Sequence, residues 1–105
     1  MTDPGPRGDA EEVCRIDQRV ETARRQAGQA QLAAAQAVDK SADCHDRAAR
    51  SYEQLAEGGG RGDEYLEHAA VHREFAQEDR RMAQRLRQDA ESDLLGGSPT
   101  ERGGA

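Results

Sequence analysis

Two histidines one helical turn apart, His68 and His72, are the side chains whose spacing could bind a metal ion. Glu64 precedes them by one more turn, and such an array can chelate zinc or a similar ion. Cys44 and His45 fall at about the same height on the other helix of the hairpin that the rest of the sequence predicts. The heptad pattern directs Cys44 and His72 into the seam between the helices. It puts His45 and His68 on opposite flanks, so we predict that these side chains do not converge and are ordinary helix residues.

Other reactive side chains do not form a pattern that predicts catalysis. The sequence shows no Ser/His/Asp or Cys/His nucleophile arrangement, no phosphate-binding glycine loop and no paired-carboxylate pocket. A cluster of arginines lies at Arg80, Arg81, Arg85 and Arg87. Acids precede and follow this cluster and no aromatic residue is interleaved, which favours a solvated charged face over a nucleic-acid site. We predict that the chain is not an enzyme and takes no cofactor and no small-molecule substrate.

Alanine dominates the apolar residues of this 105-residue chain. Of its 36 hydrophobic residues 18 are Ala and only 12 are Leu, Ile, Val or Phe, too few for a conventional core with strands. The 15 basic and 21 acidic residues give a net charge of −6 without a concentrated basic patch, so nucleic acid and anionic membranes are not expected partners. No signal-like segment or run of ten apolar residues is present. We expect a soluble cytoplasmic protein, and the Arg, Ala and Gly bias is typical of bacterial sequences.

Glycine and proline divide the chain into two helical segments. Residues 58–62 contain four glycines and indicate a loop. The long segments on either side are rich in Ala, Gln, Arg and Glu, which is a helix composition. The predicted order is a disordered tail over 1–8, a helical hairpin over 9–95 and a disordered tail over 96–105. Within the hairpin a helix covers 10–57, a loop 58–63 and a second helix 64–95.

Helix-capping residues agree with these limits. Asp9 and Glu12 have the spacing of an acidic capping box for the first helix, and Asp63 can cap the second. Gly58 and Gly96 are placed to end the first and second helices.

An uncharged stripe on the first predicted helix is the strongest pattern in the sequence. Alternating steps of three and four residues meet thirteen positions without a charge, although 34% of the chain is charged. This is the heptad pattern of a helix buried along one seam. The uncharged stripe consists of Val13, Ile16, Val20, Ala23, Ala27, Ala30, Ala34, Ala37, Ser41, Cys44, Ala48, Ser51 and Leu55. The second helix repeats the pattern, with two acids in it, at Tyr65, Ala69, His72, Ala76, Asp79, Ala83, Leu86, Ala90 and Asp93.

The short loop makes the two helices antiparallel neighbours, so facing residues have numbers that add to a constant. A sum of 120 places each stripe residue that has a counterpart opposite a seam residue of the second helix. Ser41 then faces Asp79, which predicts a hydrogen-bonded polar layer that fixes the register. The predicted fold is all-α, a long antiparallel helical hairpin resembling a coiled coil, with an alanine-rich seam.

Two features predict that this hairpin associates with another helical surface. Residue 95 reaches back only to about residue 25, so the start of the first helix has no partner although it carries bulky aliphatic residues. A second stripe of small residues, Gly28, Ala35, Ala42, Ala49 and Ala56, lies beside the uncharged stripe, and a helix that is apolar on two sides needs two neighbours. We predict a partner interface made by Val13, Ile16, Val20, Ala35, Val38, Ala42, Ala49 and Tyr52. The partner is a second copy, giving a four-helix bundle, or another helical protein.

An alternative fold breaks the first helix at Gly28 and forms a three-helix bundle. The repeat runs through Gly28 unbroken and the flanking residues lack usual turn formers, so we favour a continuous helix. In a continuous helix Cys14 and Cys44 lie about 45 Å apart, too far for a disulfide bond, and we predict free thiols.

The segments 44–49, 61–64 and 68–74 repeat Ala beside His and Arg on both sides of a Gly-Asp turn. Over about residues 40–90 the chain thereby resembles bacterial Ala- and Arg-rich helical-hairpin proteins, a resemblance that implies the fold and no activity. The function predicted is a non-enzymatic helical protein–protein interaction or assembly module. The alternative is a small metal- or redox-responsive regulator that uses Cys14 and the possible metal ligands Cys44, His45, His68 and His72.

Overall fold

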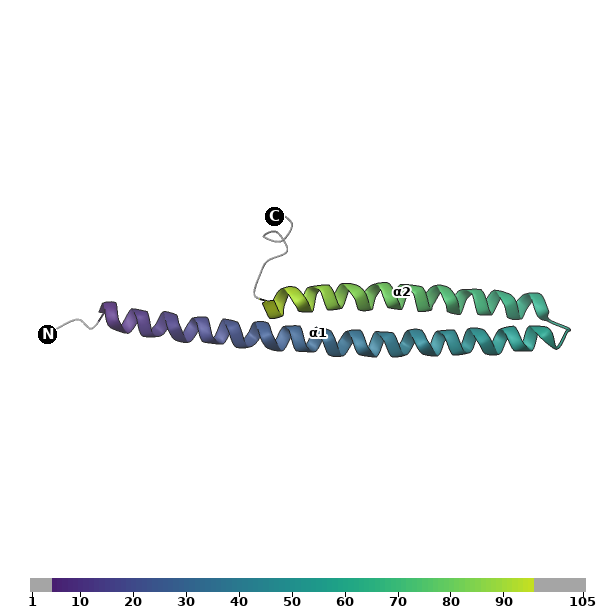
Figure 1. Cartoon of the computed structure of the whole chain (residues 1–105), viewed down its shortest axis with the longest axis horizontal. Coiled ribbons are helices and arrows are strands. Elements are labelled where there is room, and N and C mark those ends of the chain that lie inside the picture. Colours follow the sequence, from purple (N-terminus) through teal and green to yellow (C-terminus); the bar gives the residue numbers. More distant parts are fainter. Residues whose placement is uncertain (1–4, 96–105) are drawn as a thin grey trace, which may run out of the picture.

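The chain folds as two long antiparallel helices in a single layer (Figure 1). The computed structural model describes residues 5–95, with side chains from residue 9, and contains α1 (Gly5–Glu57) and α2 (Gly62–Leu95). Its shortest dimension is 14 Å, close to the diameter of about 10–12 Å of one helix. The all-α hairpin predicted from the sequence is confirmed.

The helix ends differ in part from the expected ones. α1 begins at Gly5, so Asp9 and Glu12 lie inside the helix and not at its cap. α2 begins at Gly62, so Asp63 lies in its first turn, where its negative charge complements the helix dipole. The predicted tails at 1–4 and 96–105, with Gly96, lie outside the described residues, and the tail predicted over 5–8 is helical.

Glycines close the turn between the helices. The Gly58 N–H donates to the Leu55 carbonyl at 3.2 Å and the Gly59 N–H to the Ala56 carbonyl at 3.4 Å, which ends α1 at the predicted residue. Gly59 and Gly60 have φ values of 84° and 81°, a left-handed conformation that glycine adopts without steric cost. The turn thus returns the chain at once along α1.

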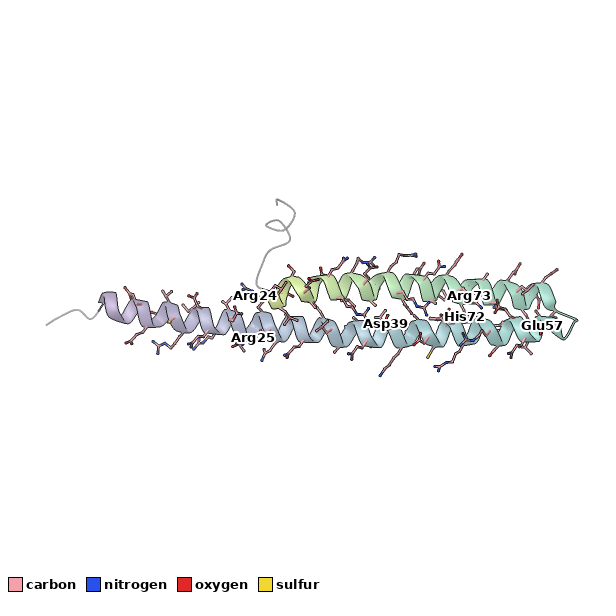
Figure 2. All side chains as sticks on the ribbon, in the orientation of Figure 1. Arg24, Arg25, Asp39, Glu57, His72 and Arg73 are labelled. Carbon is pink, nitrogen blue, oxygen red and sulfur yellow. The ribbon has the colours of Figure 1, made fainter. Side chains whose placement is uncertain are left out.

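α1 is continuous through Gly28, so the three-helix alternative is wrong. Gly28 is buried where the C-terminal end of α2 crosses α1. A Cβ atom at this position would lie 2.7 Å from Leu94 Cγ and 3.3 Å from the Ala90 carbonyl oxygen. Glycine therefore allows the end of α2 to approach α1 closely. The end of α2 lies beside Arg24, and residues 5–23 of α1 extend beyond it as an overhang (Figures 1 and 2).

The core consists of alanines at heptad spacing. The fully or almost fully buried apolar residues are Ala35, Ala42 and Ala49 on α1 and Ala69, Ala76, Ala83 and Ala90 on α2. No large side chain is fully buried among the described residues. The two rows of methyl groups form an alanine seam in which the helix backbones approach closely.

The predicted seam is right for α2 and wrong for α1. The alanine seam uses the second small-residue stripe of α1, whereas the uncharged stripe is exposed at every member except the half-buried Ala48. Ala35, Ala42 and Ala49 are therefore not part of a partner surface, and Val38 and Tyr52 are half-buried beside the seam. α1 is rotated by about one residue, roughly 100°, relative to the prediction. A row with only Gly and Ala at every seventh position faces the alanines of α2 because these residues permit the shortest interhelical distance.

The axial register agrees with the predicted alignment. The ring contacts of His45 and Tyr52 with α2 join residues whose numbers add to between 117 and 124, around the predicted sum of 120. The predicted polar layer does not form, because Ser41 is exposed. The buried Oδ2 atom of Asp79 has no hydrogen-bond partner among the described residues.

Enlarging one seam alanine tests the close approach. Ala42 has no exposed surface, so Ala42→Leu must push the helices apart, and we expect a loss of about 1–3 kcal/mol in the free energy of unfolding, measured by thermal or urea denaturation. Ala33→Leu adds the same atoms at an exposed position and should change stability by less than about 0.5 kcal/mol. Equal effects of the two substitutions would contradict the seam.

A double-mutant cycle tests why Gly28 is required. Gly→Ala inside a helix ordinarily stabilises by about 0.5–1 kcal/mol. In the wild-type chain we expect Gly28→Ala to bring no such gain, because the new methyl group meets Leu94. In a Leu94→Ala background the gain should appear in urea denaturation. The same gain in both backgrounds would mean that Leu94 does not lie against Gly28.

Candidate interaction surface

The two histidines on opposite helices meet, contrary to the sequence prediction. His45 on α1 and His72 on α2 place their Nδ1 atoms 2.9 Å apart, so one ring donates an N–H to the other. His72 lies between the helices in Figure 2. The rotation of α1 explains the difference, because it moves His45 from the flank to the edge of the seam. The other two possible ligands do not join this pair.

An aromatic cluster surrounds the histidine pair along one edge of the hairpin. Tyr52 stacks on His68, with ring centroids 5.0 Å apart, and on His72 at 5.7 Å. Phe75 packs 5.3 Å from His45. Within the part of the chain that the structure describes, no group of three or more His, Cys, Asp and Glu side chains could hold a metal ion. The arrangement accounts for the histidines as packing partners of Tyr52 and Phe75.

Both cysteines are free, as predicted, and both are exposed, so the expectation that Cys44 points into the seam is wrong. Cys44 lies in the uncharged stripe and accepts a hydrogen bond from Arg47 Nη2 at 3.1 Å. Cys14 lies on the overhang, 30 residues away along the same continuous helix. The two thiols therefore cannot react with each other within one chain.

A ladder of ion pairs occupies the opposite edge of the hairpin. Arg73 donates to Glu53 at 2.6 and 3.3 Å, Arg80 donates to Asp46 at 2.5 Å, and Arg87 pairs with Asp39. In each pair the residue numbers add to 126. Sequence analysis missed this ladder, although the signal was present: three arginines at heptad spacing on one helix and three acids at heptad spacing on the other.

The hydrogen bond from Arg80 holds the pKa of Asp46 below its ordinary value. Partial desolvation raises this pKa, and the positive charges of Arg73 and Arg50 lower it further. Because all these groups are accessible to solvent, the ladder contributes mainly to the choice of rotation and register.

The uncharged stripe is the extensive surface that the hairpin leaves without a partner. Between residues 26 and 57 no charged residue of α1 lies in the stripe, although Arg47 borders it at Cys44; the charged residues of this range are Asp39, Lys40, Asp43, Asp46, Arg47, Arg50, Glu53 and Glu57. At one end of the stripe Leu55 is 52% exposed, and at the other end Val13, Ile16 and Val20 are 49–56% exposed. The predicted interface residues Val13, Ile16 and Val20 thus lie on an open surface.

Exposed apolar residues of α2 lie beside the aromatic cluster, next to the uncharged stripe. Phe75 and Met82 are 44% and 46% exposed, and they are one heptad apart. Phe75 contacts His45, which lies one turn from Ala48 of the stripe. Phe75 and Met82 therefore lie at the edge of the hairpin next to the stripe, whereas the exposed Leu32, Leu66 and Leu94 share the heptad positions of the ion pairs at the other edge.

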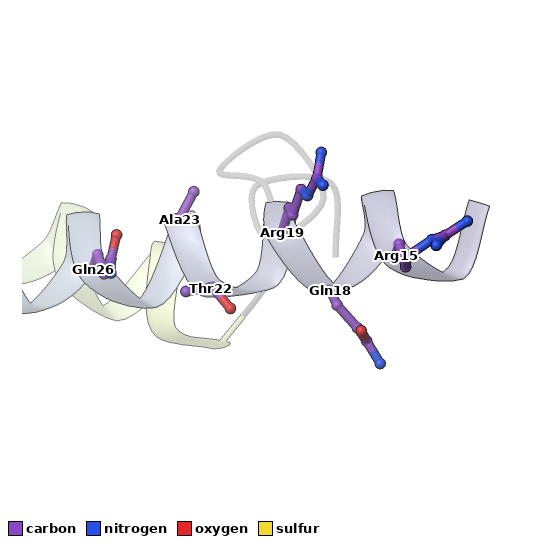
Figure 3. Close-up of a pocket in the computed structure, with 6 residues that line it drawn as sticks. All are labelled: Arg15, Gln18, Arg19, Thr22, Ala23 and Gln26. Carbon is purple, nitrogen blue, oxygen red and sulfur yellow. The ribbon is translucent and has the colours of Figure 1, made fainter. Parts of the chain in front are cut away.

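The pocket in Figure 3 is lined by Arg15, Gln18, Arg19, Thr22, Ala23 and Gln26. All six residues come from one exposed stretch of the overhang, so the feature is the surface groove of a single helix. No helix among residues 5–95 is both long and apolar enough to cross a membrane. Comparison with known protein families, curated proteins and solved structures finds no match.

Acid titration tests the ladder. Since the pKa of Asp46 is lowered on folding, its contribution is complete above the unfolded value of 3.8 and is lost as the pH falls through the lower folded value. We expect Asp46→Asn to reduce the melting temperature at pH 7 and to show a smaller further loss between pH 5 and pH 2 than the wild type. Asp17→Asn, on the overhang, should melt like the wild type throughout. An unchanged acid dependence in Asp46→Asn would contradict the Arg80 contact.

Proposed function

We propose that this protein is a non-enzymatic helical interaction module that binds a helical surface along the uncharged stripe of α1. The observation that carries the proposal is the separation of charge on α1. Eight charged residues lie between 26 and 57 and none of them occupies a stripe position, although the stripe is exposed in the hairpin.

The small core supports this proposal. The alanine seam buries only methyl groups, and the larger apolar side chains that could stabilise the fold remain at the surface. Burying one Val, Leu, Ile, Phe or Met side chain contributes about 1.5–3 kcal/mol. Binding through the stripe would therefore add burial of Val13, Ile16, Val20 and Leu55 to the small core of the hairpin. Large exposed apolar surfaces are a feature of interaction sites.

The overhang supports the same interpretation. Residues 5–23 of α1 extend for about 28 Å beyond the end of α2. Isolated helices of this length are marginal in water, and their stability in proteins comes mostly from tertiary packing. A partner that packs along Val13, Ile16 and Val20 supplies that packing.

Charge insertion at matched positions tests the function. Ala34→Glu adds a negative charge in the middle of the stripe, and Gln36→Glu adds the same charge on the opposite side of α1. We expect both variants to retain the helix content of the hairpin by circular dichroism. Self-association measured by light scattering, and capture of proteins from the native host, should be lost in Ala34→Glu and retained in Gln36→Glu. If neither association depends on Ala34, the proposed function is wrong.

A further inference from the structure

We infer that the partner of the uncharged stripe is a second copy of this chain, bound antiparallel so that facing α1 residues have numbers that add to about 68. The inference rests on the proposed function and names the partner of the same surface. A two-fold axis then passes close to Ala34. Each overhang lies against the loop end of the other hairpin.

The size pattern of the stripe is self-complementary under this reversal. Its middle contains only small residues, Ala27, Ala30, Ala34, Ala37 and Ser41, and its bulky residues stand at the two ends. A sum of 68 puts Val13 of one copy opposite Leu55 of the other and Val20 opposite Ala48. Ile16 falls opposite Tyr52, at the aromatic cluster. Small residues in the middle allow the two α1 helices the same close approach that alanine gives within the hairpin.

The charge distribution favours the antiparallel arrangement over a parallel one. Residues 43–75, around the loop, carry eight acids and four arginines and have a net charge of −4. Residues 5–27, which include the overhang and face the loop end of the other copy in the antiparallel pairing, carry five acids and five arginines and are neutral. A parallel dimer would place two loop ends, each with a net charge of −4, side by side. The antiparallel dimer instead places each loop end beside the neutral residues 5–27 of the other copy. The dipoles of the two α1 helices also favour the antiparallel arrangement.

The surface is large enough for a stable dimer. Residues 13–55 extend for about 63 Å, and a contact strip about 10 Å wide corresponds to roughly 600 Å² on α1 of each copy. Phe75 and Met82 border the same edge, and their exposed surface adds to this area. The total approaches the roughly 800 Å² per partner of a standard specific interface. Two-fold pairing also covers the overhang, which a short helical ligand would leave exposed.

Single cysteines test the arrangement in the full-length chain. In a Cys14→Ser, Cys44→Ser background, Ala34→Cys lies near the two-fold axis and should form an intermolecular disulfide bond under mild oxidation. Val20→Cys should not cross-link with itself, but a mixture of Val20→Cys and Ala48→Cys chains should. Gln36→Cys, on the opposite side of α1, measures the background of random collisions. Light scattering of the unmodified chain should give twice the monomer mass.

The outcomes separate this inference from the proposed function. Efficient self-cross-linking of Val20→Cys and Leu55→Cys above the Gln36→Cys background would show a parallel dimer and overturn the inference. A monomeric mass at millimolar concentration would also overturn it. If the chain is monomeric, a host protein that is captured by the wild type and lost only in Ala34→Glu would leave the proposed function intact, with another partner. If no such protein is captured either, both the dimer and the proposed function are wrong.

Discussion

The close approach of two helices through alanine methyl groups is the constraint on which the structure depends. Seven alanines at heptad spacing fill the seam, and Gly28 extends it to the end of α2, where even one methyl group would meet Leu94. Larger residues cannot enter such a seam, so the valines, leucines and aromatic residues lie at its edges or outside it. The same constraint that closes the hairpin therefore leaves its apolar surface open.

The sequence was sufficient to predict the hairpin, its loop, the seam of α2 and the axial register. It left the rotation of α1 undetermined, because α1 carries two adjacent stripes that are compatible with burial, and apolar periodicity alone favoured the longer one. The features that fix the rotation of α1 are contacts between pairs of residues on the two helices. Only one rotation brings Arg73, Arg80 and Arg87 beside Glu53, Asp46 and Asp39, and the same rotation aligns alanines with alanines. The need for glycine at position 28 comes from its contact with Leu94, which the sequence alone does not reveal.

The candidate site was predicted in part. Val13, Ile16 and Val20 lie on an open surface as expected, whereas Ala35, Ala42 and Ala49 belong to the hairpin itself. The contact between His45 and His72 could not be predicted, since it depends on the rotation that the sequence left open. The two edges of the hairpin therefore differ in chemistry. Ion pairs hold one edge in register, and the aromatic edge adjoins the uncharged stripe, through which we propose that the hairpin associates.

Amide hydrogen exchange along α1 at two protein concentrations tests most directly the claim that the hairpin is completed by a second molecule. In a dilute monomer, amides before Gly28 should exchange rapidly while those of residues 28–57 remain protected by the seam. At concentrations where the chain associates, protection should extend through Val13. Rapid exchange of the overhang at both concentrations, despite a measured doubling of mass, would contradict the account. Protection of the overhang in the monomer equal to its protection in the dimer would contradict it as well.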